Sequence, residues 1–427
     1  MGRKAAFLLM LLMIGATVAL ADSGKETTGF SAGDYVTIGR YEQDGNEKNG
    51  PEAIEWIVLE TEGDKAFVFS RFPLEKMSYA RDEYEVSWDW SRACDWLDGE
   101  FMENAFTEEE RKAIQYTHVD NSKEQGPGPA NRYEKYSYRG YYVYLLSYAE
   151  AVKFFPYEWQ RTGAKTDYLI NKTKEYKYEK LYTGWWLRTL GEGNKTALDV
   201  NRVGYIWPKG TKAYYSGTAI RPVMWVSQSA LTPVNTSVSL AETTSSLGEA
   251  TRAVLRARTL DEQIALLYET ASLYAKEIKK AEWDEELNWI QVKAGLEDLI
   301  PNLEDAPKVK PSSKLFKDKK IIALYSDQDM FCLLGDFYVR LPEKRRAASL
   351  EEADGILYLK HFLEYRTDYI GYAYNRIYEI YWIDRASGTA QKIYTKYTTP
   401  PRSGEGAGYG KEVSMKTLWN AIRGSIK

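Results

Sequence analysis

Few side chains in this sequence have the type and spacing that catalysis requires. His118 and His361 are its only histidines and each stands alone, so a histidine-built zinc site or a Ser-His-Asp triad has little support. Cys94 lies about 24 residues before His118, but apolar residues recur around it at helical spacing from Trp90 to Phe101. This spacing predicts a core thiol rather than a nucleophile. No GxSxG, Walker A or dinucleotide-binding motif occurs.

Carboxylates are the remaining catalytic candidates. Glycoside hydrolysis needs only two of them at the right separation, and the chain has 61 acidic residues. A hydrolase that uses a carboxylate pair, for example on a glycan, is therefore the alternative function. Because no motif selects such a pair, the sequence favours a protein that is not an enzyme and predicts no cofactor and no metal. The loop from Asp44 to Asn49 has calcium-ligating residue types without the spacing of a calcium motif, so we interpret it as a solvated turn.

Aromatic residues provide the binding candidates, in a long irregular loop from Glu124 to Arg139. Glycine, proline and charged residues interrupt its tyrosines without a strand or helix period, so some rings should be exposed. Exposed tyrosines suit stacking on sugars or gripping a peptide. The alternative is that the loop folds back and its rings cover a sheet. The candidate binding residues of this loop are Tyr133, Tyr136, Tyr138 and Arg139.

A second group of candidates lies in the segment from Gly184 to Val226, where three short apolar runs separated by turn residues predict a β-rich core. Its binding candidates are Trp185, Trp186, Arg188 and Arg221. The arginines flank tryptophans and have the chemistry to hold an anionic ligand. An arginine beside aromatic rings is equally compatible with a structural stack or a buried ion pair, and that alternative stays open.

This segment also carries a family resemblance. GWWLRTLG, ALDVNRVGYI and IRPVMWV, preceded by YVTIGRYEQD, IEWIVLE, THVDN and VYLLSYAEAVKFF, resemble a bacterial extracytoplasmic family known as domain of unknown function 6273. The resemblance covers about Tyr35 to Val226 and implies no catalytic residue. Thr189 and Leu190 depart from the Ser-Pro pair that is usual in the family. A weaker analogy is to C-type-lectin-like and formylglycine-generating-like folds, although the reactive cysteine pair of the generating enzyme is absent, which leaves a binding module.

The first 21 residues predict export. Arg3 and Lys4 precede an apolar run from Ala5 to Leu20, and an Ala-x-Ala site predicts cleavage after Ala21. We therefore expect a secreted, periplasmic or cell-surface protein with no transmembrane segment after cleavage. The formal charge of -4 becomes more negative when Arg3 and Lys4 are removed, which argues against nucleic acid as the partner and leaves a cell-surface glycan or a peptide. The oligomeric state is left open.

Composition and periodicity predict an α+β protein. We expect a β-rich N-terminal domain with short helices at 22–228, a linker at 229–245 and a helical hairpin or small bundle at 246–304. A second linker at 305–314 then leads to a C-terminal antiparallel α+β domain at 315–427. Cys94 and Cys332 fall in different predicted domains, so both thiols should be buried and unbridged.

Overall fold

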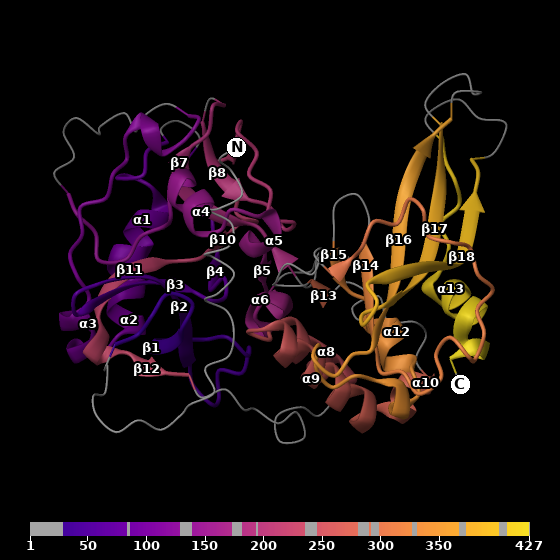
Figure 1. Cartoon of the computed structure of the whole chain (residues 1–427). Coiled ribbons are helices and arrows are strands. Elements are labelled where there is room, and N and C mark those ends of the chain that lie inside the picture. Colours follow the sequence, from indigo (N-terminus) through magenta and orange to yellow (C-terminus); the bar gives the residue numbers. More distant parts are fainter. Residues whose placement is uncertain are drawn as a thin grey trace, which may run out of the picture.

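The computed structural model confirms a mixed α+β protein (Figure 1). It describes residues 29–82, 86–128, 139–172, 182–193, 195–234, 246–280, 290–291, 299–326, 331–366, 373–400 and 408–426. Two hydrophobic cores organise these residues. One lies in the N-terminal half, and the other is shared by the central helices and the C-terminal sheet.

The first sheet of the N-terminal half is antiparallel and has the order β11-β3-β2-β1-β12. Its strands are β1 (Tyr35–Tyr41), β2 (Glu52–Glu62), β3 (Lys65–Ser70), β11 (Val223–Ser227) and β12 (Thr232–Pro233). Alternating residues separated by glycine-rich turns predict strands and turns from residue 33 to 70, and the structure has β1, β2 and β3 there. Gly63 takes the positive φ of 59° that the β2–β3 turn requires.

The second sheet has the order β4-β10-β7-β8-β9. Its strands are β4 (Glu75–Lys76), β7 (Trp185–Leu190), β8 (Thr196–Val200), β9 (Thr211–Lys212) and β10 (Ala219–Ile220). A separate two-stranded ladder pairs β5 (Gly163–Ala164) with β6 (Tyr182–Thr183). The last apolar run of the Gly184–Val226 segment divides between sheets, because β10 pairs with β7 whereas β11 pairs with β3.

Short helices pack around these sheets. Thr107 with Glu110 and Ser147 with Glu150 have the three-residue spacing that predicts a capping box, and both boxes are present. The helices are α1 (Arg92–Trp96), a π-helical turn η2 (Leu97–Phe101), α2 (Met102–Ala105), α3 (Glu108–Ala113), η3 (Lys123–Gln125), α4 (Tyr148–Phe154), α5 (Glu158–Arg161), α6 (Asp167–Lys172) and η6 (Gln228–Ala230).

The central region forms the predicted helical hairpin, from α8 (Leu247–Leu255) and α9 (Leu260–Leu273), followed by α10 (Ala275–Lys280). Its buried residues, such as Ile264 and Leu267, belong to the same hydrophobic core as the C-terminal sheet. The apolar stripe of α9 therefore packs against the C-terminal half and not only against another helix.

The C-terminal sheet has the order β13-β15-β14-β16-β17-β18, and β19 also pairs with β17. Its strands are β13 (Ile290–Gln291), β14 (Ile321–Ser326), β15 (Phe331–Leu333), β16 (Gly355–Tyr365), β17 (Ala373–Asp384), β18 (Thr389–Thr398) and β19 (Gly408–Tyr409). Its helices are α12 (Gly335–Arg340), η8 (Glu343–Arg345), α13 (Met415–Ile422) and η9 (Arg423–Ser425). The long β16–β17–β18 meander is antiparallel as predicted, and the structure adds parallel pairings of β14 with β16 and of β17 with β19.

The predicted linkers contain some paired residues. β12 lies inside the 229–245 stretch and pairs with β1. In the 305–314 stretch, Val309 N–H donates to the Lys392 carbonyl, so this segment runs beside β18. The domain boundaries remain a prediction, which proteolysis can test.

Candidate functional site

An exposed cluster of three rings lies where Tyr116, His118 and Tyr142 meet on the N-terminal domain. The Tyr116 ring centroid is 5.1 Å from that of Tyr142 and 5.7 Å from that of His118. Tyr116 is 51% exposed and Tyr142 is 37% exposed, and His118 is also exposed. We call these three residues the ring cluster. The ring cluster presents apolar ring faces to solvent, and its two tyrosine hydroxyl groups and one imidazole can form hydrogen bonds.

Backbone pairing fixes the ring cluster in place. Thr117 and Tyr141 exchange two hydrogen bonds, with N···O distances of 2.9 and 2.8 Å, so their neighbours Tyr116 and Tyr142 lie across from each other. Gly140 N–H donates to the Tyr116 hydroxyl at 2.9 Å. A Cβ at Gly140 would lie 2.8 Å from the Tyr116 ring and 2.9 Å from the Thr117 carbonyl oxygen, so only glycine fits there.

Arg139, the last residue of the candidate loop from Glu124 to Arg139, is linked to the ring cluster through Asp98. Its Nη2 lies 2.8 Å from Asp98 Oδ2, and the other oxygen of Asp98 accepts from the Tyr142 N–H at 3.1 Å. The Arg139 side chain is 44% exposed. It therefore helps to anchor the strand of Tyr142 and still reaches solvent. Tyr133, Tyr136 and Tyr138 lie outside the described residues.

The two tryptophans proposed as binding residues are in the core. Trp185 and Trp186 are fully buried, and each indole N–H is used within the protein. Trp185 Nε1 donates to the Arg161 carbonyl at 2.8 Å, and Trp186 Nε1 donates to the Met77 carbonyl at 2.9 Å. Neither offers a surface to a ligand in solvent, so both serve to hold the second sheet against its surroundings.

Arg188 forms an ion pair with Glu150, which is the structural alternative to binding a ligand that the sequence left open. Its guanidinium bonds the Glu150 carboxylate and donates to Asn121 Oδ1 at 3.0 Å and to the carbonyls of Leu145 and Asp120, each at 2.9 Å. Burial opposes the charge on Glu150, but the Arg188 charge outweighs it and keeps the pKa of this carboxyl below its ordinary value. Arg188 thus connects its own GWWLRTLG segment to THVDN and to VYLLSYAEAVKFF. Its side chain is buried, so it directs no donor to solvent.

Arg221 has a different buried environment. It donates to the carbonyls of Ser70 at 2.9 Å and of Arg71 at 2.6 Å, and its Cζ lies 4.0 Å from the Phe69 ring centroid. Burial, with a smaller contribution from the Arg71 charge, lowers the pKa of Arg221 to about 9. This is the structural stack on aromatic rings, and it fixes the passage from β10 to β11.

A small polar hollow lies beside Arg188. The residues that line it are Asn121, Ser122, Gln125, Gly126, Gly128, Thr189 and Leu190. Their polar atoms also serve the protein, since Thr189 Oγ1 accepts from the Tyr148 N–H at 2.9 Å and Gln125 Oε1 accepts from the Ser147 hydroxyl at 2.8 Å. The lining contains no carboxylate, so it does not provide the acid pair that the hydrolase alternative needs.

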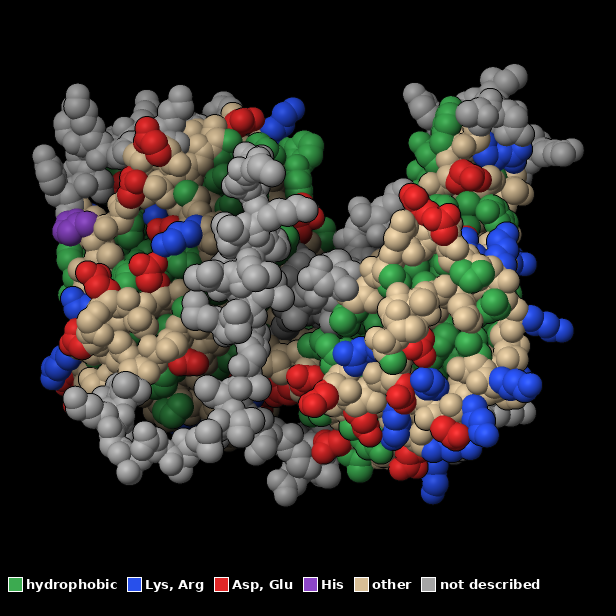
Figure 2. Space-filling model, in the orientation of Figure 1, with side chains coloured by type: hydrophobic (Ala, Val, Ile, Leu, Met, Phe, Trp, Pro, Cys, Tyr) green, Lys and Arg blue, Asp and Glu red, His purple; other side chains and the backbone are tan. Residues whose placement is uncertain are grey.

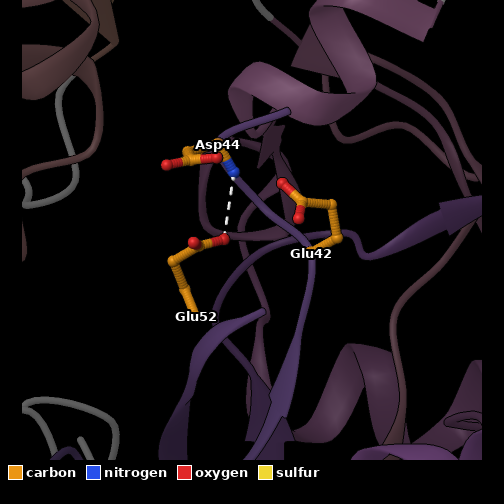
Figure 3. A group of neighbouring side chains, drawn as sticks. All are labelled: Glu42, Asp44 and Glu52. Carbon is orange, nitrogen blue, oxygen red and sulfur yellow. Dashed lines mark hydrogen bonds between the residues drawn. The ribbon is translucent and has the colours of Figure 1, made fainter. Parts of the chain in front are cut away.

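Glu42, Asp44 and Glu52 bring carboxylate oxygens within 4.8 Å of one another near the expected solvated turn (Figure 3). These oxygens already accept hydrogen bonds. Glu52 accepts from the Asp44 N–H at 3.2 Å, Glu42 accepts from the Gly45 N–H at 2.6 Å, and Asp44 accepts from Asn49 Nδ2 at 2.7 Å. The bond from Asn49 lowers the pKa of Asp44. The arrangement stabilises the turn, and nothing further points to a cation.

Both cysteines are free and buried, as predicted. The Cys94 N–H, at the start of α1, donates to the Ser91 hydroxyl at 3.0 Å. Burial raises the pKa of the Cys94 thiol. A thiol held protonated in the core is a poor nucleophile. The catalytic pairing of Cys94 with His118 therefore gains no support from its surroundings.

Tyr205 and Trp207 form a further exposed aromatic pair, which the sequence reasoning did not select. Their ring centroids are 6.1 Å apart, and they are 39% and 54% exposed. Figure 2 shows hydrophobic side chains on the upper part of the N-terminal domain, in the region of β7 and β8. The sequence signal was present in the YIW run after Gly204, but its strand-like pattern suggested core packing.

The comparisons with known proteins identify a family for part of the chain but do not indicate a function. Residues 63–228 match the family described as "Domain of unknown function (DUF6273)", so the N-terminal half contains a domain of this family. No curated protein matches the chain. No solved structure matches it either, and the lectin-like analogy therefore has no structural neighbour to support it. Among the described residues, no helix is long and apolar enough to cross a membrane.

Proposed function

We propose that this chain is an exported, non-catalytic binding protein whose N-terminal domain holds a glycan or a peptide against the ring cluster. The observation that carries the proposal is the exposed contact of Tyr116 with Tyr142, at a 5.1 Å ring separation. Aromatic faces of this size are normally buried, and here Gly140 and the Thr117–Tyr141 pairing hold them at the surface.

The chemistry of the ring cluster suits an uncharged or weakly charged ligand. The C–H face of a sugar or an apolar peptide side chain would stack on the rings, while the imidazole of His118 and the guanidinium of Arg139 would supply hydrogen bonds at the rim. The rings are fixed by backbone hydrogen bonds, so little conformational entropy would be lost on binding.

The hydrolase remains the alternative function. It would need two carboxylates facing a cleft, about 5 to 10 Å apart. Acidic groups near the ring cluster and the polar hollow have partners within the protein. Asp98 pairs with Arg139 and Glu150 pairs with Arg188. Asp120 accepts hydrogen bonds from Ser122 and Gln125. These engagements favour binding over hydrolysis. Incubation of any glycan that binds, followed by product analysis, would separate the two functions.

The proposal can be tested with the full mature chain on a glycan and peptide array. Tyr116→Ala and Tyr142→Ala should each weaken binding on the order of tenfold, as expected for a loss of about 1.4 kcal/mol. Gly140→Ala should also weaken it, because the added methyl group displaces the Tyr116 ring. Tyr215→Ala, an exposed tyrosine elsewhere on the domain, is the matched control.

The remaining variants distinguish other sites on the same domain. If Trp207→Ala abolishes binding and the ring-cluster variants do not, the site lies at the Tyr205–Trp207 pair. A combined Tyr133, Tyr136 and Tyr138 to Ala variant tests the loop that precedes Arg139. If folded wild-type protein binds no component of the array, the binding proposal is wrong.

A further inference from the structure

The C-terminal sheet carries a second row of aromatic rings, separate from the ring cluster. Tyr365 of β16, Tyr374 of β17 and Tyr409 of β19 lie side by side on neighbouring strands. The ring centroids of Tyr365 and Tyr374 are 5.4 Å apart, and those of Tyr374 and Tyr409 are also 5.4 Å apart and nearly parallel, with an interplanar angle of 14°. Tyr365 is 50% exposed and Tyr409 is 48% exposed. We call these three residues the tyrosine row.

The strand register continues the same face with cations. Arg376 lies two residues after Tyr374 along β17, on the same face, and its Cζ is 5.6 Å from the Tyr409 ring centroid. Lys396 follows, opposite Tyr378, and is exposed. His361 is stacked on Tyr378 at a centroid distance of 4.5 Å. Opposite partners in an antiparallel ladder share a face, so these side chains lie on one face of the sheet. Tyr378 is buried within this face, whereas Arg376 is half-buried and Lys396 is exposed.

Acidic residues are excluded from this part of the face. From His361 to Tyr365 and from Tyr374 to Tyr378, every position that shares the face is aromatic, apolar or basic. Glu364 and Glu379 have the opposite strand parity and lie on the other side of the sheet. Glu412, after β19, is near enough to influence Tyr378, and its neighbour Lys411 carries the opposite charge.

Arg376 has capacity for a further acceptor. Its Nε is buried and makes no hydrogen bond to any part of the chain that the structure describes. Thr398 lies directly opposite on β18, and its hydroxyl oxygen is likewise buried without a hydrogen bond among the described residues. Both atoms are enclosed by the protein, so a ligand would reach Arg376 through the exposed part of its half-buried side chain.

We propose that the tyrosine row with Arg376 and Lys396 is a binding site for an anionic polysaccharide, one whose sugar rings carry carboxylate or phosphate groups. Neighbouring strands are about 4.8 Å apart, so the row spans about 10 Å, which offers stacking positions to consecutive sugar rings. The two cations on the same face match the charge of the acidic groups.

The position of the row in the fold agrees with access by a long polymer. Figure 1 shows β16, β17 and β18 extending beyond the rest of the C-terminal domain. Figure 2 shows hydrophobic, Lys or Arg, and Asp or Glu side chains together at this outer end of the sheet. A polysaccharide chain can therefore lie across the strands without entering a closed pocket.

The test is a titration of the full mature chain with polygalacturonate, with uncharged dextran as the matched probe. When the ring cluster is removed by Tyr116→Ala/Tyr142→Ala, the protein should still bind polygalacturonate, with an affinity that falls as salt is raised, and should not bind dextran. Arg376→Gln and the Tyr365→Ala/Tyr409→Ala double variant should each weaken binding about tenfold or more. Tyr397→Ala is the matched control, because Tyr397 is 55% exposed on the opposite face of the same sheet.

Several results would overturn the proposal: no binding of polygalacturonate by wild-type protein, equal binding of dextran, or equal loss in Tyr397→Ala and Arg376→Gln. Preferential binding of oligothymidylate or of an acidic peptide would also overturn it. Thermal unfolding of each variant shows whether a loss comes from misfolding. Tyr215→Ala, outside both proposed sites, should leave polygalacturonate binding unchanged. Loss of polygalacturonate binding in Tyr116→Ala but not in Arg376→Gln would assign this binding to the ring cluster and overturn the proposal, so the two failures are distinguishable.

Discussion

Arg258 Nη2 lies 3.2 Å from Glu55 Oε1, and this ion pair joins the central helices to the first sheet of the N-terminal domain. A second contact between the same two parts of the chain joins α8 to α6. There Arg252 and Arg256 both pair with Asp167, at 2.6 and 3.0 Å. The pairing is largely polar, whereas the helices share an apolar core with the C-terminal sheet. The central helices therefore adhere to the C-terminal half by burial and to the N-terminal half by charge.

Limited proteolysis should cut first between Ser227 and Ser245, and more slowly between Asn302 and Ser313. Within the first stretch we expect cleavage after Val234, since the Val234 N–H still donates to the Tyr35 carbonyl. The fragment from residue 22 to the cut should stay folded, and the remainder should retain the helices with the C-terminal sheet. Unfolding of the first fragment on excision would mean that its core depends on the rest of the chain.

Salt should loosen the junction between the two halves. Partly exposed ion pairs contribute about 0.2–1 kcal/mol each and are screened at high ionic strength. Asp167→Asn removes the partner of two arginines and should accelerate cleavage at residues 235–245 at low salt, with little added effect at 1 M salt. Lys112→Gln, which breaks only the exposed pair with Glu108, is the control. Equal cleavage of wild-type protein and Asp167→Asn would contradict the junction.

Arg188→Met should destabilise the N-terminal domain by roughly 1–3 kcal/mol, because it removes a buried guanidinium and leaves the Glu150 carboxylate, whose side chain is 27% exposed, without its partner. Urea unfolding followed by tryptophan fluorescence measures the change. Arg139→Met serves as the comparison, since its pair with Asp98 is 44% exposed on the arginine side and should cost about 1 kcal/mol or less. Similar costs for both variants would mean that Arg188 is not the anchor of this region.

Acid should weaken the same region through Glu150. Its folded-state pKa lies below the ordinary value of 4.5, so its contribution to stability is present above about pH 4.5 and is lost as pH falls through the folded value. Glu150→Gln should flatten the dependence of the urea midpoint on pH between about 5 and 3, at the expense of stability at neutral pH. An unchanged slope in Glu150→Gln would exclude this carboxyl as a source of the acid sensitivity.

Both thiols should be labelled in denatured, unreduced protein, and neither should react quickly in the native state, because both are buried and burial raises the pKa of Cys94. Mass spectrometry after alkylation measures this. Zero labels in the denatured protein would indicate a disulfide. Rapid labelling of Cys94 in the native protein would make it a candidate nucleophile again.

Protein from its native host should begin at Asp22, as the charged start, apolar run and Ala-x-Ala site indicate. Intact-mass measurement decides this. A mature form that retains Met1 would remove the basis for export, and with it the expectation of an extracellular glycan or peptide ligand.

The sequence alone determined the features that arise within a few residues. The capping boxes at Thr107 and Ser147 use partners three residues away, and the β2–β3 hairpin depends on a local glycine turn. Helical spacing predicted the burial of Cys94, Leu97 and Phe101, which share one face of the chain from α1 to η2. The same pattern included Trp90, which precedes α1 and is 69% exposed. The α+β class followed from the sum of such local patterns.

Only the tertiary structure decided which aromatic and charged residues reach solvent. Trp185 and Trp186 are no different in type from Trp207, yet the strand that carries the first two lies inside the domain. Tyr116 meets Tyr142 because Thr117 pairs with Tyr141, and Tyr374 meets Tyr409 because β19 returns beside β17. Contacts between residues distant in sequence depend on strand register and topology, which short-range periodicity does not specify.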